Sequence, residues 1–301
     1  MATIQVHEIT KRFGHQTAVN QVTFNVEPGE IFGLLGPNGA GKTTTIRIIL
    51  DIFKPDSGSV EVLGGKMTEE KKNRIGYLPE ERGLYQDISL EMCLNYLVRL
   101  KGLKPSQTAQ RVADLMKQFG LYEHRKKKVK ELSKGMQQKA QIIATLAHEP
   151  DLIIVDEPFS GLDPVNTQMV KDLLREERNK GRTIIMSTHQ MHQVEELCDR
   201  LVLINHGKVV LYGKINEIRR NFASHKVVVH PLGELPAYLP GVLQVEQVNS
   251  GYLLHVDTGT TPQEILKSLV EANIPLEKFE IAMPTLDEIF IQVVTAQGEE
   301  A

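Results

Sequence analysis

The sequence has few cysteines, no surplus of basic residues and no long apolar run. Its two cysteines, Cys93 and Cys198, lie far apart without a CxxC spacing, which argues against a disulfide framework or a zinc site and favours a reducing compartment. Because 35 lysines and arginines face 38 aspartates and glutamates, the net charge of −3 favours neither nucleic acid nor an anionic membrane as a partner. The aliphatic stretches fall far short of the roughly 20 residues that span a bilayer, and the N-terminus has no apolar core of signal-peptide length. We therefore expect a soluble, intracellular protein that would act at a membrane only through a partner.

The length and composition fit two ordinary globular domains. A chain of 301 residues allows two domains of about 150 residues each. A hydrophobic fraction of 41 % with 24 % charged residues rules out long disorder. The pattern of the sequence changes around residues 221–226. We predict a first domain over residues 1–222 and a small accessory domain over residues 223–301.

In the first domain, segments with the pattern of strands alternate with segments with the pattern of helices. Alternating apolar residues around Ile4 and from Val22 to Val26 predict strands, and the apolar runs at 31–35 and 152–155 predict strands buried on both faces. The other expected elements are helices over about 42–53, 89–101, 105–119 and 164–181, a strand over 183–187, a helix that ends at about 198, and a hairpin over 201–212. This alternation is typical of an α/β protein with a mostly parallel sheet covered by helices.

The second domain has a different pattern. The turn Asn249-Ser250-Gly251 predicts a hairpin, and Thr285 with Glu288 forms a capping box that opens a last helix. The expected strands are 227–229, 242–248, 252–256 and 279–282, with a helix over 261–272. We predict a small α+β domain. It carries no phosphate-binding or catalytic motif, so we expect an accessory role in regulation or dimer contact.

A glycine-rich turn joins the apolar run at 31–35 to the helix that starts at Lys42. It fits the pattern G-x-x-x-x-G-K-[ST] with Gly36, Pro37, Asn38, Gly39, Ala40, Gly41, Lys42 and Thr43. Glycines let successive backbone N–H groups surround a β-phosphate, and the helix N-terminus adds partial positive charge. Lys42 would reach the β- and γ-phosphate oxygens, and the hydroxyl of Thr43 would ligate Mg²⁺. The motif predicts a nucleoside triphosphate site that also includes Thr44, and the alternative is a glycine-rich turn that binds nothing.

Two adjacent carboxylates follow the apolar run at 152–155. Asp156 and Glu157 emerge at the carboxyl end of this expected strand, where ligands bind in α/β sheets. Adjacent side chains point in different directions and can take different roles. We expect Asp156 to hold the Mg²⁺ shell and Glu157 to polarise the attacking water as a general base. An acidic turn without a function is the alternative, and the lysine motif upstream argues against it.

Three further motifs stand in a fixed order around these carboxylates. They are the segment LSKGMQQ at 132–138, the segment SGLD at 160–163, and His189. Together with the glycine-rich turn they resemble the nucleotide-binding subunit of an ABC transporter, over about residues 1–220. The resemblance implies a P-loop ATPase cassette with a mostly parallel sheet, an antiparallel N-terminal β subdomain and a helical subdomain over about residues 85–150.

The resemblance also implies how such a site works. Members of the family form a head-to-tail dimer with two ATP molecules at its interface. Lys42 of one protomer and Ser133 with Gly135 of the other would grip the same nucleotide. His189 would contact the γ-phosphate and act with Lys42 and the general base in catalysis. Phe13 matches the aromatic position that stacks on adenine.

The sequence departs from the family pattern at two places. The usual signature L-S-G-G-Q has Lys134 and Met136 at its third and fifth positions. Ser133 and Gly135, which supply the hydroxyl and the close backbone approach to phosphate, are kept. Lys134 either adds positive charge near the γ-phosphate or is solvated. The glutamine that usually follows Leu-Pro is Glu80, which can sit near Mg²⁺ but cannot donate an amide hydrogen bond.

Two further segments are similar to one subgroup of the family. The run GYLPEERGLY at 76–85 and the ending PTLDEIF at 284–290 look like ATP-binding subunits of bacterial ABC-2-type exporters, particularly those similar to the sodium-extrusion system. This implies ATP and Mg²⁺ as cofactors, with a transmembrane permease and a second cassette, in a homo- or heterodimer, as partners. It also implies a cytoplasmic subunit held at the inner face of the cell membrane by its permease, where ATP-driven dimerisation powers export.

The same ATPase module also occurs in soluble proteins that act on ribosomes or DNA. The translation-factor type carries two cassettes per chain, whereas this sequence has one phosphate-binding turn. The coiled-coil type needs a long insertion between the lysine motif and the signature, and the segment from Thr43 to Leu132 is too short. The surplus of acidic residues further disfavours nucleic acid, so we expect none as a partner.

Overall fold

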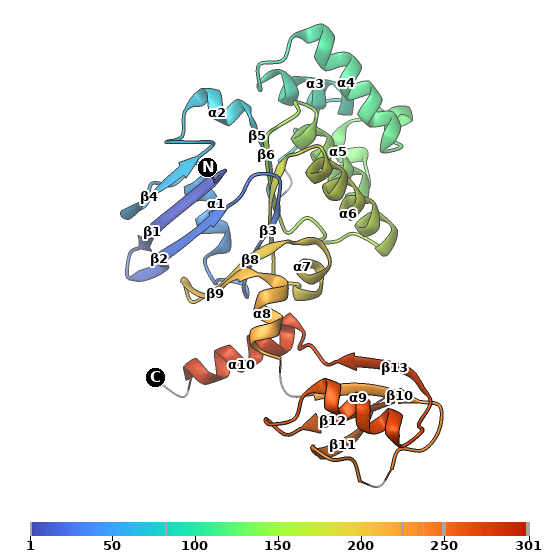
Figure 1. Cartoon of the computed structure of the whole chain (residues 1–301). Coiled ribbons are helices and arrows are strands. Elements are labelled where there is room, and N and C mark those ends of the chain that lie inside the picture. Colours follow the sequence, from blue (N-terminus) through green and yellow to red (C-terminus); the bar gives the residue numbers. More distant parts are fainter. Residues whose placement is uncertain (1, 82, 224–225, 237, 249–250, 299–301) are drawn as a thin grey trace. The chain divides into compact units, whose positions relative to one another are not determined.

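The chain forms two compact units. The computed structural model describes residues 2–81, 83–223, 226–236, 238–248 and 251–298. The units are Met1–Ile215 and Asn216–Ala301, and Figure 1 labels their helices and strands along the chain. In the described parts, no helix is both long and apolar enough to cross a membrane.

A six-stranded sheet forms the centre of the first unit. Its order is β5-β6-β7-β3-β8-β9, and every neighbouring pair except β8 and β9 is parallel. The strands are β3 (Ile31–Leu35), β5 (Ile75–Leu78), β6 (Leu152–Asp156), β7 (Thr183–Thr188), β8 (Arg200–Asn205) and β9 (Lys208–Lys214). All residues of β3, β6 and β7 are buried, as in parallel sheets covered on both faces. The predicted α/β class with a mostly parallel sheet is confirmed.

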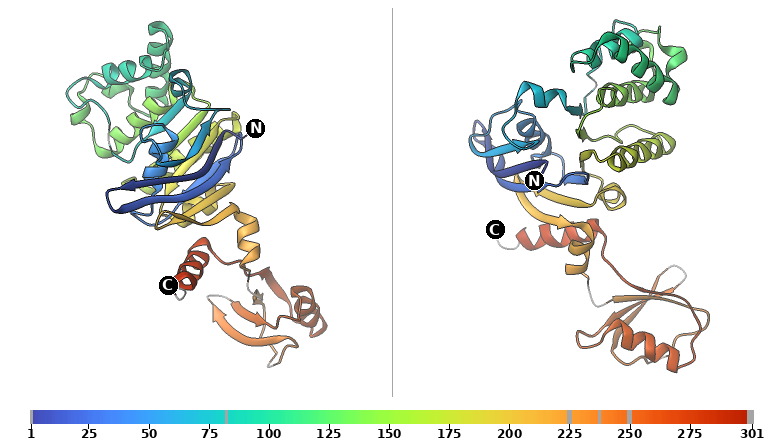
Figure 2. Two further views of the ribbon diagram at one scale, coloured as in Figure 1. Left: turned by 90° about the vertical axis from the view of Figure 1, so that its left-hand side faces the viewer. Right: turned by 45° about the horizontal axis from the view of Figure 1, so that its top comes forward.

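A three-stranded antiparallel sheet packs with α1 against the central sheet. Its order is β2-β1-β4, with β1 (Ile4–Phe13), β2 (Gln16–Val26) and β4 (Ser57–Val62). Figures 1 and 2 show α1 (Lys42–Ile49) between the two sheets. Side chains from both sheets and from α1 share one buried cluster. The antiparallel β subdomain expected at the N-terminus is therefore present.

Helix α1 is shorter than the apolar pattern predicts. It ends at Ile49, whereas the sequence predicts a helix to about residue 53. Asp51 has a φ of +62°, in the left-handed region where helices commonly end. The side chain of Phe53 still packs against the buried cluster, so the apolar pattern continues although the helix has stopped.

The chain between β5 and β6 is helical, as expected for residues 85–150. Its elements are α3 (Leu90–Arg99), α4 (Pro105–Gln118), α5 (Lys134–Leu146) and the 3₁₀ turns η1 (Tyr122–His124) and η2 (Val129–Glu131); the short α2 (Glu69–Asn73) precedes β5. Ser89 begins α3 because its hydroxyl accepts a hydrogen bond from the backbone N–H of Met92 at 3.3 Å. Proline in the first turn of α4 has the fixed φ that a helix start requires.

Two more helices follow strands of the central sheet. They are α6 (Pro164–Asn179) after β6 and α7 (Met191–Leu197) after β7. Asp163 caps α6, since its Oδ1 accepts a hydrogen bond from the backbone N–H of Asn166 at 2.9 Å. The helix start predicted from Asp163 and Pro164 is confirmed.

The second unit holds a four-stranded antiparallel sheet. Its order is β11-β12-β10-β13, and it shares a buried cluster with α9. The elements are α8 (Ile215–Asn221, which begins at the boundary), β10 (Lys226–Pro231), β11 (Val242–Val248), β12 (Gly251–Val256), α9 (Pro262–Glu271), β13 (Leu276–Ile281) and α10 (Leu286–Gly298). Thr285 and Glu288 form the predicted capping box through backbone N–H bonds of 2.8 and 3.2 Å. An α+β fold is therefore present, although two residues of the predicted hairpin turn, 249 and 250, lie outside the described residues.

The compact units divide earlier than the sequence pattern indicates. The pattern places the boundary between residues 222 and 223, whereas the contacts divide the chain after Ile215. Helix α8 accounts for the difference. Its Arg219 donates hydrogen bonds to the carbonyl oxygens of Pro284 at 2.9 Å and Met283 at 3.4 Å, so α8 is tied to the segment that precedes α10.

A buried histidine follows α5. His148 is 9 % exposed, and its Nε2 donates to the carbonyl oxygen of Ile75 at 3.1 Å. Within the described residues its Nδ1 has no hydrogen-bond partner. Burial, followed by the charge of Lys101, lowers the pKa of His148 to about 4. The folded protein therefore keeps this imidazole neutral near pH 7.

We expect His148 to make stability depend on pH between about 4 and 6.5. The unfolded chain protonates this histidine below about pH 6.5, so its contribution is fully present above that pH and is lost as the pH falls towards 4. From pH 7 to pH 5, wild type should lose about 2 kcal/mol more unfolding free energy than His148→Gln. Urea unfolding followed by circular dichroism measures this difference, with His15→Gln, at an exposed position, as the control. Equal pH dependence in wild type and His148→Gln would contradict it.

Candidate functional site

The glycine-rich turn between β3 and α1 takes a conformation that side chains would block. Gly36 and Gly41 have φ values of +149° and +108°. A Cβ atom at Gly36 would lie 2.1 Å from the carbonyl oxygen of Ile204, and one at Gly41 would lie 2.4 Å from that of Ala18. Only glycine fits both positions. The turn leads directly into the N-terminus of α1, where free backbone N–H groups favour an anion.

Lys42 folds back over the turn that precedes it. Its Nζ donates to the carbonyl oxygens of Gly36 at 2.7 Å and Pro37 at 3.2 Å, and lies 4.0 Å from Oε1 of Glu157. The side chain is buried. Burial lowers the pKa of Lys42, while the carboxylates of Glu157 and Asp156 act in the opposite direction. The ammonium group is thus held over the turn by weak carbonyl partners that phosphate oxygens can replace.

Asp156 ends β6 and is held from two sides. Its Oδ1 accepts a hydrogen bond from the hydroxyl of Ser187 at 2.6 Å, and its Oδ2 accepts one from the hydroxyl of Thr43 at 3.1 Å. Burial raises the pKa of Asp156, whereas these two hydrogen bonds lower it. A carboxylate and a hydroxyl therefore stand side by side, which is an oxygen donor set suited to Mg²⁺.

Glu157 has a strained backbone and a fully engaged carboxylate. Its φ is +48°, which is uncommon for a residue other than glycine. Its Oε2 accepts a hydrogen bond from the hydroxyl of Thr188 at 3.1 Å. Its Oε1 accepts two hydrogen bonds from His189, one from the backbone N–H at 3.0 Å and one from the ring Nδ1 at 2.8 Å. These bonds from the end of β7 fix the carboxylate beside Lys42. Strain held in this way is typical of functional sites.

These groups line one cleft. Its volume is about 460 Å³, within the range of small-molecule sites. Phe13 lies at its edge, 46 % exposed and in edge contact with Phe53, with 5.5 Å between ring centroids. The lining residues are Phe13, Gln16, Ala18, Asn38, Gly39, Ala40, Gly41, Lys42, Thr43, Thr44, Glu80, Asp156 and Glu157. The structure thus brings Phe13, Glu80, the turn from Asn38 onwards and both carboxylates together, whereas Gly36 and Pro37 do not line the cleft. His189 joins them through its hydrogen bonds to Glu157.

Ser133 and Gly135 do not line this cleft. Ser133 begins α5, and its hydroxyl accepts a hydrogen bond from the backbone N–H of Met136 at 3.3 Å. Ser133 is exposed. Ser133 is therefore available at the surface, with Gly135 half-buried beside it, instead of contributing to the cleft of its own chain.

Two positioning residues are not among those that the sequence pattern predicts. Ser187 and Thr188 end β7 and hold Asp156 and Glu157 by the hydrogen bonds described above. Both are buried. The rule that ligands bind at the carboxyl ends of parallel strands would have pointed to both, because they immediately precede His189.

Comparisons with known proteins identify the family of the chain. Residues 19–160 match the family model described as ABC transporter, and residues 213–294 match the model described as ATP-binding protein DrrA1-3-like, C-terminal domain. The chain is 39 % identical over 298 residues to the uncharacterized ABC transporter ATP-binding protein YhaQ of Bacillus subtilis, covering 98 % of this chain and 100 % of that protein.

A second relative and a solved structure are also similar to this chain. The linearmycin resistance ATP-binding protein LnrL of Bacillus subtilis is 31 % identical over 303 residues, which cover 96 % of this chain and 97 % of that protein. A solved structure of an ATP-binding subunit of an ABC transporter superposes with a TM-score of 0.69 at 33 % identity, covering 73 % of this chain and 93 % of the other.

Proposed function

Because this chain belongs to the ATP-binding subunits of ABC transporters, we propose that the cleft at the glycine-rich turn is where it hydrolyses ATP. Its relatives are transporter ATPases of exporter-type systems. ATP binding and hydrolysis in support of transport follow from the family. The observation that carries the assignment to this cleft is the meeting of Lys42, Asp156 and Glu157 at one edge of the sheet.

Backbone and side-chain groups take the triphosphate in this proposal. The N–H groups of residues 38–41, which line the cleft, and the N-terminus of α1 surround the β-phosphate. The ammonium of Lys42 exchanges its carbonyl partners for β- and γ-phosphate oxygens. Adenine stacks on Phe13 at the rim. Thr44, the third residue of α1, completes the phosphate contacts.

The residues present fit a magnesium ion. The hydroxyl of Thr43 and the carboxylate of Asp156 are 3.1 Å apart, and Glu80 lines the same cleft. These three side chains would hold the ion. When bound, Mg²⁺ neutralises charge on the β- and γ-phosphate oxygens. Ser187 keeps Asp156 oriented whether or not the ion is present.

Glu157 acts as the general base. Its carboxylate accepts the proton of the attacking water, which leaves a more nucleophilic oxygen to attack the γ-phosphorus. The bond from the γ-phosphorus to the bridging oxygen breaks, and ADP and inorganic phosphate are the products. Thr188 and the backbone of His189 hold the carboxylate in place. The ring of His189 is about half exposed and turns from Glu157 to the γ-phosphate when ATP is bound.

A second cassette completes the site. Ser133 and Gly135 lie at the surface of the helical part of the unit, outside the cleft of their own chain. In a head-to-tail pair each signature segment faces the nucleotide of the partner. The hydroxyl and backbone N–H groups at the start of α5 then meet the γ-phosphate from the side opposite Lys42.

A groove beside α3 is the docking surface for the permease in this proposal. Met92, Tyr96 and Leu100 form a stripe along α3 and are 60, 48 and 60 % exposed. Next to it lies a hollow of about 340 Å³ lined mainly by apolar side chains. Gln141 Oε1 and His148 Nδ1 belong to residues that line it, and in the described part of the chain both atoms are buried without a hydrogen-bond partner. An apolar segment that offers N–H donors, such as the first turn of a helix in the permease, covers the apolar lining and donates hydrogen bonds to these two atoms. Through this contact the subunit stays at the cytoplasmic face of the membrane.

We expect substitutions on the stripe to uncouple the subunit from its permease. Tyr96→Asp with Leu100→Asp places two charges on the apolar stripe at exposed positions, so the fold should persist. Co-purification with the co-expressed permease should fall at least roughly tenfold, because a buried unpaired charge costs more than about 1.4 kcal/mol. Basal ATPase activity of the free subunit should change less than about twofold. Glu91→Gln on the same helix is the control. Unchanged co-purification would place the permease elsewhere, and co-purification with ribosomes or DNA would favour the other class of ABC ATPase.

We expect Phe13→Ala to raise KM for ATP without lowering kcat. Stacking on adenine is the same in the ground state and the transition state, so its loss weakens binding only. A stacked base contributes about 1–3 kcal/mol, which predicts a roughly 5- to 150-fold rise in KM. Phe13→Tyr should restore the wild-type KM, and steady-state ATPase kinetics measure all three proteins. A tenfold fall in kcat with unchanged KM would remove Phe13 from the adenine site.

A further inference from the structure

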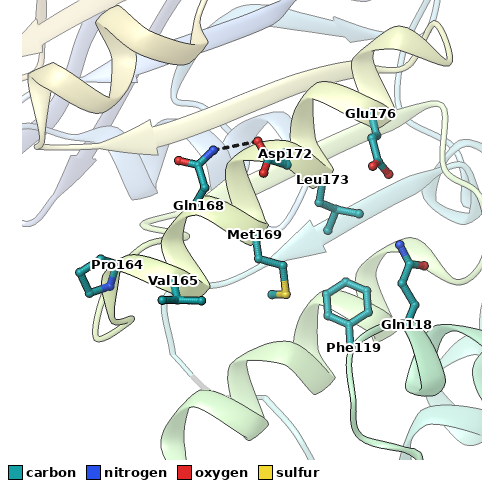
Figure 3. A pocket seen from close by; sticks show the side chains of 9 residues that line it. All are labelled: Gln118, Phe119, Pro164, Val165, Gln168, Met169, Asp172, Leu173 and Glu176. Atoms are coloured by element: carbon teal, nitrogen blue, oxygen red, sulfur yellow. Dashed lines mark hydrogen bonds between the residues drawn. The ribbon is translucent and has the colours of Figure 1, made fainter.

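A second cavity lies between α6 and the C-terminal end of α4. Its volume is about 640 Å³, which exceeds that of the nucleotide cleft and falls within the range of small-molecule sites. Figure 3 shows Met169 and Leu173 of α6 on one wall and Phe119 on the other. Phe119 and Leu173 are 5 and 7 % exposed. No step of ATP hydrolysis uses this cavity.

One end of the cavity is polar and negatively charged. Gln118 and Glu176 face each other there (Figure 3). Neither side chain has a hydrogen bond or ion pair in the described part of the chain. Asp172 also lines the cavity, but it already accepts hydrogen bonds from Gln168 at 2.8 Å and Arg175 at 3.2 Å.

The neighbouring cations are engaged elsewhere. Lys180 lines an adjacent hollow together with Glu176, but its Nζ is 2.8 Å from Glu177. Arg175 binds Asp172 and Glu196, the latter at 2.9 Å. The carboxylate of Glu176 is therefore the free charge that a ligand in the cavity would meet.

From this arrangement we infer that the cavity between α4 and α6 binds an amphipathic organic cation. The apolar part of such a molecule packs between Phe119 and Met169, whose aromatic ring and flexible thioether provide apolar, polarisable contact surface. Its positive head lies against Glu176, and the amide of Gln118 accommodates a polar substituent. A neutral molecule leaves Glu176 without a partner, and an anion is repelled by Glu176 and Asp172. The ligand would contact the helical part of the unit and α6 at once.

Methyl NMR of the full-length protein tests this inference. The chain has nine methionines, and Met169→Leu assigns the ¹³C-methyl signal of Met169. The probes are octyltrimethylammonium, octanol and octanoate, which share one apolar chain and differ in charge. Met186, buried in β7, reports non-specific effects.

Octyltrimethylammonium should shift the Met169 signal saturably and leave Met186 unchanged. It should bind wild type about fivefold more tightly than octanol, and octanoate should bind most weakly. Glu176→Gln, at an exposed position, should bring the cation to the affinity of octanol without changing octanol binding, whereas Glu123→Gln should change neither. The inference fails if Met169 does not shift, if Met169 and Met186 shift together, or if cation and alcohol bind wild type equally.

Discussion

Glu157→Gln should lower ATP hydrolysis roughly 10²- to 10⁴-fold, the range that positioned acid–base catalysis supplies. The amide keeps the size of the side chain and one oxygen that can orient water, but it cannot take up the proton. ATP binding should survive, because Lys42, Thr43 and Asp156 still hold the phosphates and the metal. One fewer negative charge beside the γ-phosphate should strengthen binding, if it changes at all.

Single-turnover hydrolysis and equilibrium binding of ATP separate these two effects. Glu123→Gln removes a carboxylate at an exposed position outside the cleft and should match wild type in both measurements. A Glu157→Gln protein that hydrolyses ATP at the wild-type rate would remove this residue from the mechanism. Loss of binding together with hydrolysis would make Glu157 a structural residue of the cleft.

Lys42→Ala should differ from Glu157→Gln because it weakens ATP binding as well as hydrolysis. The ammonium is the cation that lies over the turn, with carbonyl partners at 2.7 and 3.2 Å. A hydrogen bond to a charged group contributes about 1.5–3 kcal/mol, so ATP affinity should fall roughly 10- to 150-fold. The lost stabilisation of charge in the transition state should reduce kcat a further 10²- to 10³-fold, as for other preorganised donors.

Lys127→Ala, which removes an exposed lysine in the loop before the signature, is the matched control for Lys42→Ala. Nucleotide binding by calorimetry and the hydrolysis rate should both be unchanged in this control. If Lys42→Ala bound ATP as tightly as wild type, the triphosphate would lie elsewhere than over the glycine-rich turn. The contrast between Lys42→Ala and Glu157→Gln therefore separates the binding role from the catalytic role.

Much of the first unit follows from sequence because its signals are local. The glycine-rich turn must follow a buried strand, and β3 is fully buried. The carboxylates Asp156 and Glu157 must emerge at the end of a strand, and β6 ends at Asp156. Caps such as Asp163 act within one turn of a helix. Patterns that depend on a few neighbouring residues could therefore be predicted correctly.

Strands without an apolar pattern could not be predicted. Ser57 and Gly58 look like the end of a turn, yet they begin β4, where Ser57 pairs with Thr10 of β1. Most of β4 is exposed, and only residues 60–62 alternate between apolar and polar types, a run too short to indicate a strand. β5 has four residues, too few to show a period. Pairing with neighbouring strands, which the sequence does not show, forms both elements.

In the candidate site, too, local patterns could be predicted from the sequence and tertiary contacts could not. The turn and the two carboxylates could be placed by pattern alone. The roles of Ser187 and Thr188 depend on the adjacency of β6 and β7 in the sheet, which is a tertiary contact. Ser133 and Gly135 were assigned to the site of a partner, and their absence from the cleft of their own chain is what that assignment requires.

The central claim is that the ATP site of one chain is completed by the signature segment of another. Light scattering on Glu157→Gln tests it most directly, because this variant should retain ATP between two protomers. With ATP and Mg²⁺ the mass should double from the 33.8 kDa of one chain, and it should stay at the single-chain value without ATP. Adding Ser133→Arg, at an exposed position, should prevent the dimer while leaving ATP binding intact. A Glu157→Gln protein that binds ATP and remains a single chain would contradict the account.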